Sequence, residues 1–165
     1  MSKTRIAVAG AGYIGQAHIG VALNSTTCVL SAIVDPSPAA GEVAVKAGVR
    51  LFKSIDELLA QDRPDGLVLA TPNHLHVAQG LQCIAAQLPI LLEKPIATTV
   101  MDGEQLVKAV QATGAKVLIG HHRAHSPIMA KAKEVVDSGK LGKHNCVNLT
   151  PWGPPTIHVH FYFVT

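Results

Sequence analysis

The sequence predicts an α/β protein with a Rossmann-type, doubly wound parallel sheet. Short apolar runs typical of strands alternate with helical patterns of roughly 10 to 15 residues, which indicates βαβ units with right-handed crossovers. These runs lack polar alternation, as expected when helices cover both faces of a sheet. The first run leads into a glycine-rich turn, 10–15, that opens a helix.

The individual elements follow from apolar runs and from residues that begin or end helices. The expected strands cover residues 6–9, 29–35, 49–53, 67–70, 90–92 and 116–119. The first expected helix begins near Tyr13, and the others cover residues 39–47, 55–61, 76–87, 101–113 and 127–138. Ser54 and Glu57 have the spacing of a capping box, and Thr99 precedes a helix as a cap. Gly48 and Gly114 are placed to end helices.

The turn after the first strand carries the spacing G-x-G-x-x-G at Gly10, Gly12 and Gly15. Gly10 permits a tight turn, Gly12 lets the backbone approach a pyrophosphate, and Gly15 lets the helix pack closely on the strand. The free N–H groups and positive dipole end of the helix then favour an anion. Asp35 ends the second strand, 20 residues after Gly15, at the offset expected for a carboxylate that binds a ribose diol. The alternative is a glycine cluster that only packs a helix; the sequence context favours a dinucleotide site.

Composition excludes several classes of function. The chain has 165 residues, is 48% hydrophobic, and spreads a net charge of +3 along its length, so a nucleic-acid surface is not expected. No apolar run approaches the roughly 20 residues of a membrane span, and the N-terminus lacks a secretory signal. Cys28, Cys83 and Cys146 have neither zinc nor disulfide spacing, which favours reduced thiols. We therefore expect a cytoplasmic protein without nucleic-acid or membrane partners.

The loops that follow strands are the places where ligands bind in such a sheet. In the loop 71–76, Pro72 is expected to pack against the cofactor while Asn73 and His76 face the site; alternatively, Asn73 or Thr71 only caps a helix.

Glu93, Lys94 and Pro95 follow a buried apolar run, where charged groups are costly unless they are used or satisfied. Lys94 is expected to hydrogen-bond a substrate hydroxyl beside the nicotinamide; alternatively, Glu93 and Lys94 form an ordinary salt bridge at a sheet edge. A cis bond before Pro95 is compatible with the sequence but not assignable from it.

The histidines do not match a metal site. His121, His122 and His125 have no standard zinc spacing, so we expect polar residues that line the cofactor cleft and no metal. His158 and His160 lie two apart on an expected strand, which favours a surface pair.

The character of the sequence changes after Gly120. We predict a dinucleotide-binding domain over residues 1–124, and over 125–165 the beginning of a second α/β domain with an atypical tail. A strand is expected to begin at 146–149. The tail segment IHVHFYFV has high β propensity and little charge, so it is a hazard for aggregation unless it is covered.

The motifs VAGAGYIGQAH, ATPNHLH, EKP and GHHRAHSP, in this order and with Asp35 between the first two, resemble the glucose–fructose oxidoreductase/inositol dehydrogenase (Gfo/Idh/MocA) family over about residues 4–145. The resemblance implies an NAD(P)-dependent oxidoreductase that acts on sugars, inositols and related polyols. It also implies a Rossmann domain followed by an α/β domain with a large open sheet.

The resemblance assigns roles by position. The pyrophosphate loop is then formed by Gly10, Gly12, Tyr13, Ile14 and Gly15, and the loop beside the cofactor by Thr71, Pro72, Asn73 and His76. Asp35 takes the place of the ribose-binding acid, which favours NAD over NADP because a 2′-phosphate would meet a carboxylate without an adjacent Arg. Glu93 and Lys94 become the nicotinamide-side pair, with Lys94 as the catalytic lysine. His122, with Arg123, lines the cleft and is the one local candidate for the proton acceptor, whereas Ala124 departs from the pattern.

Members of this family are usually much longer, and their second domain supplies substrate contacts and an acid/base His. A truncation by frameshift, premature stop or natural shortening is therefore expected. The first functional hypothesis is hydride transfer between nicotinamide and a sugar or polyol hydroxyl. The second is a non-catalytic NAD-binding module, and the third is an interaction protein that forms a homo-oligomer through its tail.

Overall fold

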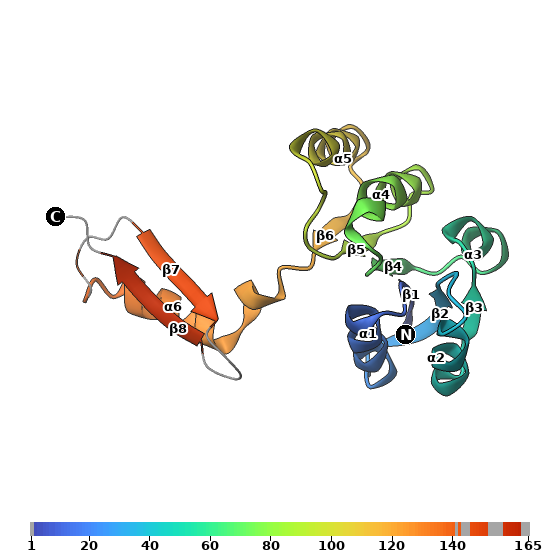
Figure 1. Cartoon of the computed structure of the whole chain (residues 1–165), viewed down its shortest axis with the longest axis horizontal. Coiled ribbons are helices and arrows are strands. Elements are labelled where there is room, and N and C mark those ends of the chain that lie inside the picture. The colour runs from blue at the N-terminus through green and yellow to red at the C-terminus, as the bar shows by residue number, and fades with distance from the viewer. Residues whose placement is uncertain (1, 141, 143–145, 152–156, 163–165) are drawn as a thin grey trace. The chain divides into compact units, whose positions relative to one another are not determined.

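A six-stranded sheet organises the first part of the chain, and all of its neighbouring strands pair in parallel (Figure 1). The strands are β1 (Thr4–Ala9), β2 (Cys28–Val34), β3 (Arg50–Phe52), β4 (Gly66–Leu69), β5 (Ile90–Leu92) and β6 (Val117–Ile119). Their order across the sheet is β3-β2-β1-β4-β5-β6. This is the order of a doubly wound Rossmann sheet, whose direction of winding reverses between β1 and β4. The predicted fold class is confirmed.

The computed structural model describes residues 2–140, 142, 146–151 and 157–162. Two compact units are formed, Met1–Gly120 and His121–Thr165. The predicted domain boundary between residues 124 and 125 stays a prediction.

The helices of the first unit begin and end at residues suited to those positions. They are α1 (Tyr13–Leu23), α2 (Ala40–Ala47), α3 (Ile55–Gln61), α4 (His76–Ala85), preceded by the 3₁₀ turn η1 (Asn73–Leu75), and α5 (Val100–Thr113). The Ser54 hydroxyl caps α3 by accepting from the N–H of Glu57, 3.1 Å away. Thr99 caps α5 in the same way. The predicted helix 76–87 ends earlier, because Gln87 adopts a positive φ of 54° and the chain turns back there.

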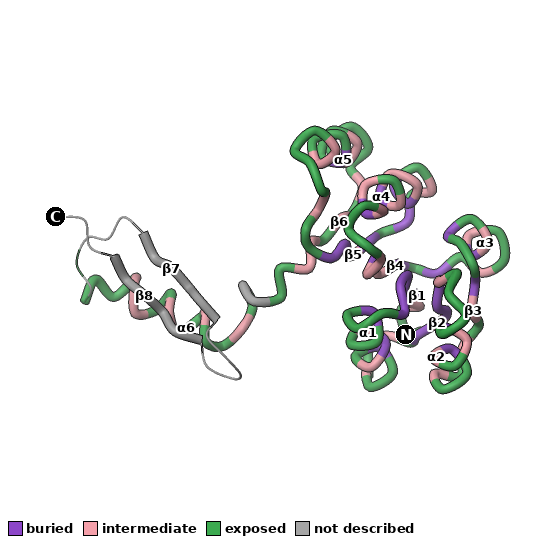
Figure 2. The backbone as a smooth tube through the Cα atoms, viewed as in Figure 1, coloured by how far each residue is buried: buried purple, intermediate pink, exposed green. Residues whose placement is uncertain are grey.

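Two apolar clusters form the core on opposite faces of the sheet (Figures 1 and 2). One joins the strands to α3, α4 and α5 and contains Phe52, Leu58 and Leu92, each almost fully buried. The other joins the strands to α1 and α2. Burial on both faces explains why the strand sequences are continuously apolar.

An apolar groove of about 590 Å³ lies on the α1 side of the sheet, over β4, β5 and β6. Strand pairing aligns Val8, Val68, Leu91 and Leu118 in one row across four strands. Val8 is fully buried at one end of this row, whereas Leu118 is 62% exposed at the other. Helices α1 and α2 of the first unit therefore cover this face over its β1 side and leave it open toward β6.

The second unit contains the 3₁₀ turn η2 (His122–His125), α6 (Pro127–Asp137), and the antiparallel strands β7 (Cys146–Pro151) and β8 (Ile157–Tyr162). Ser126 caps α6 by accepting from the N–H of Met129. The helix predicted over residues 127–138 is confirmed, and so is the prediction that a strand begins at Cys146. The side chains of His158 and His160 lie outside the described part of the chain.

Candidate functional site: the edge of the sheet after β1, β2, β4 and β5

The turn after β1 packs so tightly that two of its glycines have no room for a side chain. Gly10 has a φ of +91°, and a Cβ there would lie 2.4 Å from the carbonyl oxygen of Ala70. A Cβ on Gly15 would lie 1.7 Å from the carbonyl oxygen of Gly10. The absence of both side chains lets α1 begin directly against the end of the sheet.

Gly12 is different, because the space beside it is open. A Cβ on Gly12 would meet no atom within 4 Å, and the neighbouring Tyr13 is 89% exposed. Gly12 occupies the N-cap position of α1 and has no side chain with which to cap the helix. The start of an eleven-residue helix, with the positive end of its dipole, therefore borders open space where an anion fits.

Asp35 follows β2 and is tied to this turn. Its Oδ2 accepts a hydrogen bond of 2.8 Å from the N–H of Ala11, and its Oδ1 accepts one of 2.8 Å from the N–H of Ser37. Burial raises the pKa of the Asp35 carboxyl, but the hydrogen bonds from Ala11 and Ser37 and the charge of Lys53 outweigh it, so the pKa is lowered overall. Asp35 is thus a carboxylate at neutral pH, beside the glycine turn.

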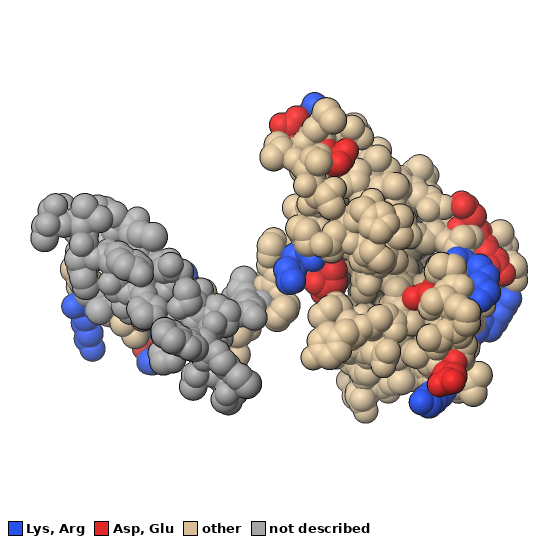
Figure 3. Space-filling model, in the orientation of Figure 1, with Lys and Arg blue, Asp and Glu red and all other residues tan. Residues whose placement is uncertain are grey.

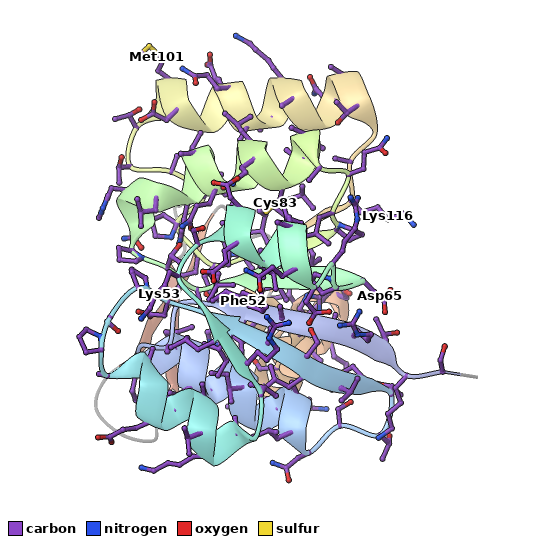
Figure 4. All side chains as sticks on the ribbon, turned by 90° about the vertical axis from the view of Figure 1, so that its right-hand side faces the viewer. Phe52, Lys53, Asp65, Cys83, Met101 and Lys116 are labelled. Atoms are coloured by element: carbon purple, nitrogen blue, oxygen red, sulfur yellow. The ribbon has the colours of Figure 1, made fainter. Side chains whose placement is uncertain are left out.

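A pocket of about 810 Å³ lies along this edge of the sheet. Five of the predicted site residues line it: Gly10, Gly12, Asp35, Thr71 and Pro72. Ser37, Lys53 and Gln79 line it as well and were not predicted. Figure 4 shows Lys53 at the end of the sheet opposite Asp65 and Lys116, so the pocket lies where the strands end rather than where they begin. Its size is in the range of small-molecule and cofactor sites.

The loop after β4 is fixed by side chains of its own helix. The Thr71 hydroxyl donates to Gln79 Oε1 at 2.5 Å. The ring of His76 is fully buried, with Nε2 2.9 Å from the Thr71 carbonyl oxygen and Nδ1 2.7 Å from the Pro95 carbonyl oxygen. Carbonyl oxygens only accept, so the ring donates to one of them as a neutral imidazole and to both as an imidazolium. The ring therefore holds two loops together and does not face the pocket.

The alternative that Asn73 or Thr71 only caps a helix is not what the structure shows. No side chain caps η1 or α4, within the part of the chain that is described. The side chain of Asn73 is exposed at the beginning of η1.

Glu93 and Lys94 follow β5, which is an internal strand between β4 and β6 and not an outer strand of the sheet. Glu93 is 9% exposed, and its Oε1 lies 2.8 Å from Nε2 of His18 on α1. Its Oε2 accepts from the backbone N–H of Lys94 at 3.2 Å. The bond between Lys94 and Pro95 is cis, and the Lys94 side chain is exposed.

His18 was not predicted to have a role. It lies within the motif at the start of α1, but its contact with Glu93 joins residues 75 positions apart. The detectable signal is a polar side chain on the side of α1 that packs on the sheet, where apolar residues are expected.

The loop after β6 lies in the second unit. His121, His122 and His125 are exposed, and the side chain of Arg123 is outside the described residues. No group of three or more potential metal ligands occurs among the residues that the structure describes. The expected role of His122 stays a prediction. On the visible surface of the first unit, acidic and basic side chains are interspersed (Figure 3).

The chain is similar to known proteins of one oxidoreductase family. A family described as an oxidoreductase family with an NAD-binding Rossmann fold, Gfo/Idh/MocA, matches residues 4–121. The rhizopine catabolism protein MocA of Rhizobium meliloti is 27% identical over 94% of this chain and 50% of its own. An inositol 2-dehydrogenase of Rhodococcus erythropolis is 33% identical over 91% of this chain and 45% of its own.

A similar structure is that of the WlbA dehydrogenase from Bordetella pertussis, crystallised with NADH and UDP-GlcNAcA. It is 31% identical, with a TM-score of 0.82 over 90% of this chain and 46% of its own. The chain thus spans about half the length of the curated relatives it matches.

Proposed function

Because the chain belongs to the Gfo/Idh/MocA oxidoreductase family with its NAD-binding Rossmann fold, we propose that it works with NAD(H) as a dehydrogenase domain. The proposed reaction is hydride transfer between nicotinamide and a hydroxyl-bearing carbon of a sugar or polyol. The substrate class is supported by relatives that include inositol 2-dehydrogenases and by the similar WlbA dehydrogenase, which was crystallised with UDP-GlcNAcA.

The observation that carries the proposal is the placement of Asp35 beside the glycine turn. The carboxylate is 2.8 Å from the N–H of Ala11, one residue before the N-cap of α1. The start of α1, which suits an anion, and the Asp35 carboxylate, which suits a diol, are thereby adjacent. A dinucleotide needs this arrangement. Asp35 also favours NAD over NADP, because a 2′-phosphate would meet a carboxylate.

The residues fit this cofactor. The open space beside Gly12 leaves room for the diphosphate against the N–H groups of α1, and Asp35 is placed to accept from the ribose hydroxyls. When bound, the nicotinamide supplies the hydride acceptor or donor. Lys94 would donate a hydrogen bond to the reacting oxygen and stabilise its negative charge, and His122 is proposed as the proton acceptor.

Titration with NADH, followed by its fluorescence, tests binding directly. We expect saturation in the full chain, and the proposal fails if no cofactor binds at millimolar concentration. Turnover is then tested by incubating NAD with a panel of inositols and sugars and following the formation of NADH. Activity that disappears in Lys94→Ala supports the dehydrogenase.

A second candidate is a module that binds NAD(H) without turnover. It is favoured by one observation, that the chain spans about half the length of its relatives. Saturable NADH binding with no turnover on any polyol would select it. Self-association through the tail belongs to this candidate, and sedimentation of the full chain against a chain that ends at Leu149 tests it.

We also propose that the protein is located in the cytoplasm. Among the residues that the structure describes, no helix has the length and apolarity needed to span a bilayer. Cys28 and Cys83 are free thiols, which supports a reducing compartment such as the cytoplasm. Cell fractionation tests this location.

A further inference from the structure

Lys94 lies between two residues that are each held by a histidine from another element. Before it, the carboxylate of Glu93 contacts Nε2 of His18 on α1 at 2.8 Å. After it, the carbonyl oxygen of Pro95 contacts Nδ1 of His76 on α4 at 2.7 Å. The residues on both sides of the lysine are therefore held by different helices, Glu93 through its side chain and Pro95 through its backbone carbonyl.

These contacts are well shielded from water. The side chains of His18 and Glu93 are 25% and 11% exposed, and the ring of His76 is fully buried. A hydrogen bond away from water is stronger than an exposed one, so these contacts hold their geometry more firmly. Lys94 itself is exposed, and its long side chain has little intrinsic order.

The carboxylate of Glu93 also reaches the lysine directly. Its Oε2 accepts from the backbone N–H of Lys94 at 3.2 Å while its Oε1 contacts His18. The space beneath it is closed, since a Cβ on Gly120 would lie 2.8 Å from Oε1. Glu93 therefore links His18 on α1 to the backbone of Lys94.

We propose that His18 and His76 are positioning residues that set the place of the Lys94 ammonium group beside the nicotinamide. His18 acts through Glu93, and His76 acts through the carbonyl of Pro95. This inference rests on the proposed function. It adds two residues that act through the neighbours of Lys94 in the chain, one before it and one after it.

The charge on the nicotinamide ring provides a test that separates positioning from support of the fold. A residue that only supports the fold would not change the relative affinities for NAD⁺ and NADH. The ring is positive in NAD⁺ and neutral in NADH, so a nearby ammonium disfavours NAD⁺ relative to NADH. The ratio of the two dissociation constants, Kd for NAD⁺ over Kd for NADH, therefore reports where the ammonium lies. ADP-ribose lacks the ring and reports whether the rest of the site is intact.

The experiment measures the Kd of NAD⁺, NADH and ADP-ribose for the full chain and its variants by calorimetry. Lys94→Met should lower the ratio about three- to tenfold. His18→Phe should lower the ratio in the same direction, while the Kd of ADP-ribose stays within about twofold. His18→Gln keeps an N–H donor near the Nε2 position and should restore most of the ratio. His74→Gln changes an exposed histidine in η1 and should leave all three constants unchanged.

Three results would overturn the proposal, and they are distinguishable. An unchanged ratio in His18→Phe, with a lowered ratio in Lys94→Met, means that the lysine finds its place without the histidine. An unchanged ratio in Lys94→Met means that the ammonium is not beside the ring, although NAD binding stands. If the unaltered chain binds neither NADH nor ADP-ribose, the proposed function fails as well. His76→Phe removes both ring contacts with the carbonyl oxygens of Thr71 and Pro95 and is expected to destabilise the fold. The His18 variants are therefore the ones that decide whether the proposal holds.

Discussion

The carboxylate of Asp35 accepts a hydrogen bond of 2.8 Å from the backbone N–H of Ala11, which ties the end of β2 to the turn after β1. The second carboxylate oxygen accepts from Ser37, in the loop that leads to α2. One side chain thus shapes the pocket and is also placed to contact a ligand in it. The two roles can be separated by experiment.

Asp35→Asn should weaken NADH binding by roughly tenfold or more. The amide keeps one acceptor oxygen but loses the charge that strengthens hydrogen bonds to the ribose, and such bonds contribute about 1.5–3 kcal/mol. Fluorescence titration with NADH measures the change. Asp65→Asn is a matched control, because Asp65 accepts from the backbone N–H of Arg5 at the other end of the sheet. Equal losses of affinity in the two variants would argue that Asp35 only supports the fold.

The stabilising effect of Asp35 should disappear in acid. Its folded-state pKa is lowered below the ordinary value of 3.8, so the carboxylate stabilises the fold at pH values above about 4. The contribution is lost as the pH falls through the folded-state pKa. Urea unfolding of the unaltered chain and of Asp35→Asn should show a constant difference from pH 5 to 7 that narrows below about pH 4. A difference that grows in acid would contradict the sign of the shift.

The sheet and the glycine turn could be predicted from the sequence because both depend on short stretches of the chain. Apolar runs define the strands, the positive φ of Gly10 is a property of the turn, and Gly15 is required because its Cβ would meet the Gly10 carbonyl oxygen within the same turn. The offset between Gly15 and Asp35 reflects the length of one helix and one strand. Such features depend on near neighbours in the chain.

The contacts around Lys94 could not be predicted in this way. His18 meets Glu93 only because α1 packs over the sheet next to the end of β5, and His76 meets Pro95 only because two loops converge. His76 was expected to face the site, whereas its ring lies between the loops. A polar side chain at such a position shows that it needs a partner, but the partner depends on the tertiary packing of distant segments.

Cys83 should react with alkylating reagents more slowly than Cys28, the other cysteine whose environment is described. Burial raises the pKa of its thiol to about 12, so roughly one thiol in ten thousand is ionised at pH 8. Cys28 is only partly buried. Alkylation with iodoacetamide, followed by peptide mass spectrometry, should label Cys28 well before Cys83. Addition of urea should abolish the difference, and rapid labelling of Cys83 in the folded chain would contradict its burial.

Three glycine-to-alanine substitutions should separate folding from binding. In Gly15→Ala the new Cβ meets the Gly10 carbonyl oxygen at 1.7 Å, so we expect a loss of several kcal/mol or no folded protein. In Gly12→Ala the Cβ meets nothing, and the φ of −71° suits alanine, so stability should change by less than about 1 kcal/mol. NADH binding should nevertheless fall by at least tenfold, because the methyl group occupies the space proposed for the diphosphate.

Gly20→Ala is the control for both variants. Gly20 lies within α1, and a Cβ there also meets nothing within 4 Å. Alanine is favoured over glycine inside a helix, so this variant should gain about 0.5–1 kcal/mol and bind NADH unchanged. Thermal melts and fluorescence titrations give the two readouts. Normal NADH affinity in a folded Gly12→Ala would place the diphosphate elsewhere and remove the basis for the proposed cofactor site, because the open space at Gly12 would then serve no ligand.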